Sequence, residues 1–172
     1  MTFDFRSLIA DVPDFPKKGV VFKDITPLLS DPEGFASAID RMAEPFVGKG
    51  IRVVAGIESR GFLLATPIAY RLGAGVVPIR KKGKLPRRTH SATYDLEYGQ
   101  DSIEAHCDAF PPGTKVLLVD DVLATGGTAR AACELLEQLH GKILGLTFLI
   151  ELEFLKGRDK LPGRSIHSLI SY

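Results

Sequence analysis

Three nearly continuous apolar runs divide the chain, and each has the length of a buried strand. They are Ile51–Ile57 (IRVVAGI), Val116–Val119 (VLLV) and Ile143–Ile150 (ILGLTFLI), and Val76–Ile79 is a shorter candidate. Runs of this kind are typical of parallel strands that helices cover on both faces. The pattern therefore predicts the interior of an α/β sheet.

Helical periodicity fills the segments between these runs. The range Phe35–Phe46 follows Asp31 and Pro32, which suit the N-cap and the first turn of a helix. The range Gly61–Leu72 is apolar but contains Pro67, so we expect a kink or a late helix start there. Both segments are long enough to cover a sheet face.

The most regular helical pattern covers about residues 128–140. Its leucines and alanines fall on one face, and Glu134, Glu137 and Gln138 fall on another. Because strand-like and helix-like periods alternate, we expect an α/β fold with a mostly parallel central sheet flanked by helices. A chain of 172 residues has the length of one domain, so we expect a single domain over residues 1–172.

Two regions do not fit the parallel core. Residues 80–92 are basic and rich in glycine, proline and polar groups, so we expect a mobile loop there. Short strands are predicted at Thr93–Tyr98 and Ser102–Ala105, around a turn at Gly99. We expect the N-terminal forty residues, about 1–40, and the C-terminal tail to form a small hood over the sheet.

Composition and charge exclude several classes of protein. No apolar run approaches the roughly 20 residues that span a bilayer, and the N-terminus lacks the pattern of a signal peptide. A net charge of +1 gives no general attraction to nucleic acid or anionic lipid. Cys107 and Cys133 lie far apart, and the four histidines show no metal-ligand spacing. We therefore expect a cytoplasmic protein with no membrane or nucleic-acid partner.

A candidate anion site follows the strand at Val116–Val119. The sequence continues as DDVLATGGT over residues 120–128 and opens the most regular helix. A loop that leads into a helix N-terminus offers free backbone N–H groups and the positive end of the helix dipole. Gly126 and Gly127 allow close approach of a phosphate, and Thr125 and Thr128 add hydroxyl donors.

Asp120 and Asp121 extend this site beyond a phosphate. Adjacent carboxylates repel each other unless sugar hydroxyls or a divalent cation offset the repulsion. The alternative is a capped turn with two solvated aspartates, which is the more ordinary interpretation of either dipeptide alone. The complete array of strand, acidic pair, glycine turn and helix favours a ribose 5-phosphate unit. The loop has neither a Walker A nor a G-x-G-x-x-G pattern, which disfavours ATP hydrolysis and hydride transfer.

The motif at 116–128 closely resembles the phosphoribosyl-diphosphate-binding motif of the type I phosphoribosyltransferases. These enzymes move phosphoribose from 5-phosphoribosyl-1-diphosphate to a nitrogen base and release pyrophosphate. Three further segments, FPKKGVVFKDI at 15–25, RKKGKLP at 80–86 and YDLEYG at 94–99, are similar to segments of adenine phosphoribosyltransferases. The resemblance covers nearly the whole chain. It implies the type I fold with a small hood and a flexible catalytic loop, and purine salvage with AMP as product.

The resemblance assigns four residues to the adenine base. Phe22 would stack on the purine face, and the backbone of Val21 would read its edge. Leu152 would pack on the other side of the base. Lys23 stands where some relatives carry arginine, which leaves the strength of its contact open because the two side chains are not equivalent donors. A core phenylalanine behind a glycine turn is the alternative for Phe22.

Ala124 bears on which purine is used. Enzymes that act on 6-oxopurines usually place an aspartate at this position of the loop, facing the base. Because no carboxylate stands here, another acid must handle the proton of the purine. The resemblance implies that Glu97 is this acid, with Tyr98 beside it in the catalytic loop, whereas a solvated turn carboxylate is the alternative. Hypoxanthine, guanine and xanthine are therefore less favoured than adenine.

The pyrophosphate end is expected at two basic segments. Glu58, Ser59 and Arg60 follow the strand at 51–57, and Arg60 would donate to the diphosphate. The resemblance implies an unusual peptide bond between Glu58 and Ser59, with cis and trans both open. Arg80, Lys81 and Lys84 belong to the densest cationic cluster of the chain, which would close over the diphosphate. A solvated loop and a nucleic-acid patch are the alternatives for this cluster.

The resemblance further implies a cofactor and a partner. Mg²⁺ would be held mainly by diphosphate and ribose oxygens rather than by a protein-built metal site. In the family, residues that match Arg80 reach the active site of a neighbouring subunit, which implies a homodimer. A regulator that senses phosphoribosyl diphosphate and binds nucleic acid is the rival from another class, and the net charge of +1 argues against it.

Overall fold

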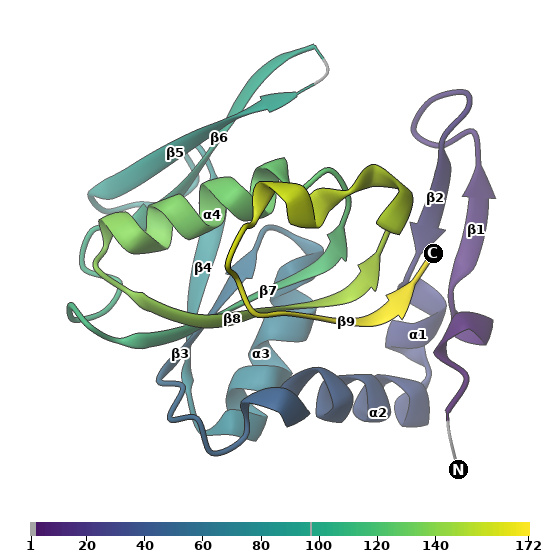
Figure 1. Ribbon diagram of the computed structural model, residues 1–172, viewed down its shortest axis with the longest axis horizontal. Helices are drawn as coiled ribbons and strands as arrows, with labels where there is room; N and C mark the ends of the chain where they lie inside the picture. The colour runs from purple at the N-terminus through teal and green to yellow at the C-terminus, as the bar shows by residue number, and fades with distance from the viewer. Residues whose placement is uncertain (1–2, 97) are drawn as a thin grey trace.

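The computed structural model describes residues 3–96 and 98–172 of the chain. A seven-stranded sheet in the order β5-β6-β4-β3-β7-β8-β9 forms its centre (Figure 1). The neighbouring strands β4, β3, β7, β8 and β9 are parallel to one another. Strand β6 is antiparallel to both β4 and β5. The predicted α/β fold with a mostly parallel sheet is confirmed.

The strands and helices have the following bounds. The sheet contains β3 (Val53–Ile57), β4 (Gly75–Lys81), β5 (Thr89–Leu96), β6 (Gly99–His106), β7 (Lys115–Leu123), β8 (Lys142–Glu151) and β9 (Ile166–Ser171). A separate hairpin consists of β1 (Ala10–Pro13) and β2 (Val21–Asp24). The α-helices are α1 (Thr26–Ser30), α2 (Pro32–Ala43), α3 (Arg60–Leu72) and α4 (Gly127–Gln138). Short 3-10 helices are η1 (Phe5–Leu8), η2 (Glu44–Phe46), η3 (Glu153–Leu155) and η4 (Gly157–Lys160). Within the described ranges, no helix combines the length and apolar character needed to cross a membrane.

Helices cover both faces of the parallel strands. The core on one face joins α2 and α3 to the sheet, and the core on the other face joins α4 to it (Figure 1). Successive side chains of a strand point to opposite faces, so Leu117 enters the first core and Leu118 enters the second. This two-sided burial explains why β7 has an unbroken apolar sequence.

The predicted start of α2 is confirmed, whereas the expected late start of the next helix is wrong. The side chain of Asp31 accepts a hydrogen bond from the Gly34 N–H at 2.7 Å, with Pro32 as the first helical residue. Helix α3 begins at Arg60 and includes Pro67 in its interior. An interior proline costs roughly 3 kcal/mol, but α3 buries Leu64 and Ile68 completely and so retains its helical form.

The basic segment is shorter as a loop than its composition predicts. Strand β4 continues through Lys81, and β5 begins at Thr89, so residues 82–88 connect them rather than 80–92. Arg80 and Lys81 pair with Glu104 and Ile103 of β6. Backbone pairing with a neighbouring strand therefore overrides the polar composition at both ends of this segment.

The segments expected to form the hood divide between the main sheet and a separate hairpin. At the C-terminal end of the chain, β9 pairs with β8 and extends the main sheet. Helix α2 falls within the N-terminal segment but packs on the face of the sheet, because Ala38, Ile39 and Met42 are buried there. What stands beside the sheet is the β1–β2 hairpin (Figure 1).

Candidate active site

A pocket of ≈ 480 Å³ is lined by residues at and just after the carboxyl ends of β3 and β7. In open α/β sheets, ligands bind beyond these strand ends. Its walls include predicted site residues from four separate segments of the chain. They are Val21, Phe22 and Lys23 of β2, Glu58, Ser59 and Arg60 after β3, Asp120, Asp121, Ala124 and Thr128 around the end of β7, and Leu152 after β8.

The glycine loop forms a small cavity of its own. Thr125, Gly126 and Gly127 line a space of ≈ 70 Å³ that shares Asp120 and Thr128 with the larger pocket. Gly126 has a φ of +81°, which strongly favours glycine, and it directly precedes α4. The first N–H groups of this 12-residue helix are available to a ligand, so the loop has the geometry of an anion site.

The acidic pair sits beside this loop in an asymmetric environment. The carboxylate of Asp121 is buried and lies 2.6 Å from Nε of Arg60, as measured from Oδ2. The Asp121 N–H donates to Oδ1 of Asp120 at 2.9 Å. Burial and the neighbouring charge of Asp121 raise the pKa of Asp120 well above its usual value. A ligand that donates hydroxyl groups or brings a cation would stabilise the ionised form of Asp120.

The turn between β3 and α3 connects two parts of the pocket. The Glu58–Ser59 peptide bond is cis, which is one of the two forms that the resemblance left open. Arg60 is the first residue of α3, and its guanidinium carbon lies 4.7 Å from the ring centroid of Phe22. The same guanidinium pairs with Asp121, so Arg60 links the aromatic wall to the acidic pair.

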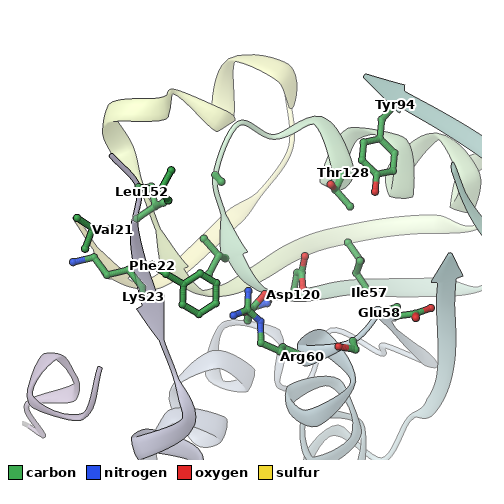
Figure 2. A pocket seen from close by; sticks show the side chains of 15 residues that line it. Val21, Phe22, Lys23, Ile57, Glu58, Arg60, Tyr94, Asp120, Thr128 and Leu152 are labelled. Atoms are coloured by element: carbon green, nitrogen blue, oxygen red, sulfur yellow. Dashed lines mark hydrogen bonds and ion pairs between the residues drawn. The ribbon is translucent and has the colours of Figure 1, made fainter. Parts of the chain in front are cut away.

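Glu58 directs its carboxylate away from Arg60, as Figure 2 shows. It accepts from the Lys81 N–H at 2.9 Å and from the Lys84 ammonium, and it lies 3.4 Å from Nε of Arg80. Burial alone would raise the pKa of Glu58, but these donors and cations outweigh it and hold the pKa below the usual value. Glu58 therefore holds Arg80, Lys81 and Lys84, the predicted cationic residues, beside the pocket.

The predicted base-binding residues divide into two groups. Phe22 and Leu152 come from different elements and line the same pocket (Figure 2). Phe15 supports Phe22 through an edge-on ring contact at 5.2 Å between centroids. The ammonium of Lys23 instead lies 2.6 Å from Asp11 and 3.9 Å from the ring centroid of Tyr172. Lys23 thus lines the pocket, but its ammonium is engaged by Asp11 and Tyr172, which do not line it.

Tyr94 is a pocket residue that sequence reasoning did not single out. It lines the cavity from β5, is 7% exposed, and donates to Oδ2 of Asp101 at 3.2 Å. Figure 2 shows its hydroxyl close to Thr128. Burial raises the pKa of Tyr94, so its hydroxyl remains a donor at neutral pH. Its position two residues after the buried Ala92 was the available signal, because alternate residues of a strand share a face.

The two predicted residues of the catalytic loop, Glu97 and Tyr98, are not assigned a contact with the pocket. Glu97 lies outside the described residues. Tyr98 is 86% exposed, and the ammonium of Lys17 lies 5.5 Å from its ring centroid. The proposed roles of both residues therefore remain predictions.

Comparison with known proteins gives a consistent result. The family model described as "Phosphoribosyl transferase domain" matches residues 28–164. An adenine phosphoribosyltransferase of Thermobifida fusca is 57% identical, with 98% of each chain covered. One from Acidobacterium capsulatum is 55% identical, with 97% of this chain and 92% of the relative covered.

Solved structures agree with these sequence relatives. The adenine phosphoribosyltransferase of Thermoanaerobacter pseudethanolicus has a TM-score of 0.95 and 50% identity, with 98% of each chain covered. The enzyme from Saccharomyces cerevisiae has a TM-score of 0.90 and 43% identity, with 96% of each chain covered. Fold, pocket and relatives together show that the chain belongs to the adenine phosphoribosyltransferases, a family of the type I phosphoribosyltransferase fold.

Proposed function

We propose that the chain transfers phosphoribose from 5-phosphoribosyl-1-diphosphate to adenine, giving AMP and pyrophosphate in purine salvage. The observation that carries this proposal is the order of groups along two adjoining cavities that share Asp120 and Thr128. An apolar wall at Phe22 and Leu152 is followed by the Asp120–Asp121 pair and then by the glycine loop. This order matches base, ribose and 5′-phosphate. The Saccharomyces relative was crystallised with adenine and an imino-altritol bisphosphate.

Adenine binds between apolar surfaces that exclude water. Phe22 stacks on one face of the purine, Leu152 packs on the other, and the backbone of Val21 reads the edge of the ring. Because residue 124 is alanine, this position of the loop has no carboxylate that could face the base. Adenine must lose a proton as its nitrogen bonds to the sugar, and Glu97 accepts this proton.

The ribose is held by Asp120 and Asp121. Their carboxylates accept hydrogen bonds from the sugar hydroxyls, which offsets the repulsion between the two charges. Bond breaking at the anomeric carbon runs ahead of bond making, so that carbon gains oxocarbenium character. The two nearby negative charges favour this developing positive charge more than they favour the ground state.

The diphosphate leaves toward the cations that border the pocket. Arg60 donates to it from the start of α3, and Ser59 contributes from the same turn. Lys81 and Lys84 exchange their contacts with Asp101 and Glu58 for the diphosphate as residues 82–88 close, and Arg80 leaves Glu58 for the diphosphate of the neighbouring subunit. Closure also excludes water, which would otherwise hydrolyse the sugar.

Mg²⁺ fits this site as a cofactor. Asp120 and Asp121 offer the oxygen ligands that it prefers, and the raised pKa of Asp120 marks a place where positive charge is stabilising. The cation would be held mainly by ribose and diphosphate oxygens, and it would neutralise charge on the leaving group.

We further propose a cytoplasmic homodimer. Cys107 and Cys133 are both free thiols, in keeping with a reducing compartment. Leu63 and Tyr70 lie seven residues apart on α3 and are 51% and 90% exposed, which gives one side of this helix an apolar character suited to a second subunit. Arg80 of one subunit would then support the site of its neighbour.

The double variant Asp120→Asn, Asp121→Asn tests the ribose assignment. The KM for phosphoribosyl diphosphate should rise by at least about tenfold, since two charge-assisted hydrogen-bond acceptors are lost. Asp40→Asn is the control, because it removes a carboxylate from the exposed surface. Unchanged affinity of the double variant for phosphoribosyl diphosphate would contradict the assignment.

A further inference from the structure

The glycine loop carries less positive charge than its proposed ligand requires. A phosphate monoester has a charge of about −1.5 to −2 at neutral pH. The side chains of residues 124–128 are all neutral. A helix N-terminus supplies the equivalent of roughly half a positive charge. A further cation close to the loop would therefore strengthen phosphate binding considerably.

A segment distant in sequence packs directly against this loop. A Cβ placed on Gly126 would lie 2.3 Å from the carbonyl oxygen of Gly157, the first residue of η4. A Cβ placed on Gly157 would lie 2.4 Å from the carbonyl oxygen of Ala124. The two backbones thus meet without intervening side chains. The position of η4 is thereby set relative to the glycine loop.

An ion pair fixes η4 to the sheet as well. Nε and Nη2 of Arg158 each lie 2.7 Å from one carboxylate oxygen of Glu151, the last residue of β8. Glu151 is 4% exposed and also accepts from the hydroxyl of Ser168 in β9 at 2.7 Å. A two-point contact between planar groups restricts orientation as well as distance. Arg158 therefore holds the residues on either side of it in place.

Lys160 is the last residue of η4, and its ammonium lies next to the glycine loop. The point that a Gly127 Cβ would occupy lies 3.9 Å from Nζ of Lys160 and 4.0 Å from Oγ1 of Thr125. Cations around the pocket have carboxylate partners, such as Asp121 for Arg60 and Glu58 for Lys84. Over residues 3–96 and 98–172, Lys160 forms no such ion pair. Its charge is available to a ligand.

We propose that Lys160 is the cation of the 5′-phosphate site, held there by the Gly157 contact and the Arg158–Glu151 pair. The ligand is the phosphate monoester at the 5′ position of the ribose donor, so the inference rests on the proposed function. Lys160 is a binding residue whose contribution is electrostatic. It acts on the donor in the ground state and in the transition state alike, because the 5′-phosphate takes no part in bond breaking.

The test compares Lys160→Gln with Lys142→Gln by calorimetric titration of two anions. Lys142 is exposed at the opposite end of β8 from Glu151, so its variant loses the same charge away from the site. For Lys160→Gln, the Kd for ribose 5-phosphate should rise about tenfold, as expected for loss of a charge-assisted contact. The Kd for inorganic pyrophosphate should change by less than about twofold. Lys142→Gln should match the wild type with both anions.

Steady-state kinetics provide the second measurement. The KM for phosphoribosyl diphosphate should rise in Lys160→Gln, while kcat and the KM for adenine stay within about twofold, which is the signature of lost uniform binding. Lys160→Arg, which keeps the charge, should restore most of the affinity.

Three results would overturn the proposal. They are equal affinities of Lys160→Gln and Lys142→Gln for ribose 5-phosphate, parallel losses of ribose 5-phosphate and pyrophosphate binding, and a failure of Lys160→Arg to restore affinity. Failure of the proposed function is a separate result. In that case the wild type releases no pyrophosphate with adenine, whereas the selective loss of ribose 5-phosphate binding in Lys160→Gln still supports the phosphate cation.

Discussion

Replacing Gly126 with alanine should lower the free energy of unfolding by about 2–5 kcal/mol. At a φ of +81°, a residue with a Cβ costs roughly 1–2 kcal/mol relative to glycine. The new methyl group would lie 2.3 Å from the Gly157 carbonyl oxygen, and overpacking of this kind typically costs about 1–3 kcal/mol. For a chain of this length, the sum corresponds to a fall in Tm of about 4–20 °C.

Replacing Gly127 with alanine should leave the stability of the protein nearly unchanged but weaken the binding of phosphoribosyl diphosphate. A Cβ at this position meets no atom closer than 3.9 Å, so the methyl group fits without strain in the free protein. Gly127 is the first residue of α4, where alanine adds at most about 1 kcal/mol of stability. The methyl group would, however, occupy space assigned to the 5′-phosphate. The KM for phosphoribosyl diphosphate should therefore rise by about tenfold or more.

Urea unfolding at one fixed protein concentration and steady-state kinetics on the same preparations measure both effects. The fixed concentration matters because association of subunits contributes to apparent stability. Wild-type stability in Gly126→Ala would show that the Gly157 contact does not require glycine at position 126. A loss of stability in Gly127→Ala as large as that in Gly126→Ala, or an unchanged KM in Gly127→Ala, would refute the assignment of the open space to the phosphate.

Two further predictions concern carboxylates. Glu97→Gln should lower kcat by about 100-fold or more, with little change in the affinity for phosphoribosyl diphosphate, and an unchanged kcat would remove Glu97 from the mechanism. Asp120→Asn should be more stable than the wild type at neutral pH. The raised pKa of Asp120 means that the folded state binds its proton more tightly than the unfolded state, so ionisation costs stability as pH rises above 3.8. Unfolding curves between pH 4 and 8 should show this advantage shrinking toward acid, and an advantage that is constant with pH would contradict it.

Local features of the site were predictable from the sequence because they are contiguous. Residues 116–128 contain the strand, the acidic pair, the glycine turn and the start of the helix in one run. The N-cap at Asp31 depends on a hydrogen bond to a residue three positions away, which is equally local. Such features require no knowledge of how distant segments meet.

Features that depend on distant contacts were missed. Lys160 lies more than thirty residues from Gly127, and its place follows from the Arg158–Glu151 pair and from the backbone contact at Gly157. Tyr94 enters the pocket because β5 crosses near α4. Nothing in the sequence around Lys160 indicates such a position, and strand alternation places Tyr94 on the same face as Ala92 without indicating what that face contacts.

Strand boundaries were misjudged for a related reason. Arg80 and Lys81 are strongly polar, yet their backbones pair with β6, a partner that lies more than twenty residues later in the chain. The C-terminal strand β9 likewise gains its place from β8, whereas its own sequence alternates only weakly. Pairing partners, rather than composition, decided both cases.

Transfer of phosphoribose to adenine can be tested by measuring pyrophosphate release with each purine in turn. The purified chain is supplied with phosphoribosyl diphosphate and with adenine, hypoxanthine, guanine or xanthine, each with and without Mg²⁺. We predict rapid pyrophosphate release with adenine that requires Mg²⁺, with AMP formed in equal amount, and a kcat/KM at least about 100-fold lower for each 6-oxopurine. Release that is as fast with hypoxanthine or guanine, or absent with adenine, would show that the chain does not use adenine as its specific acceptor.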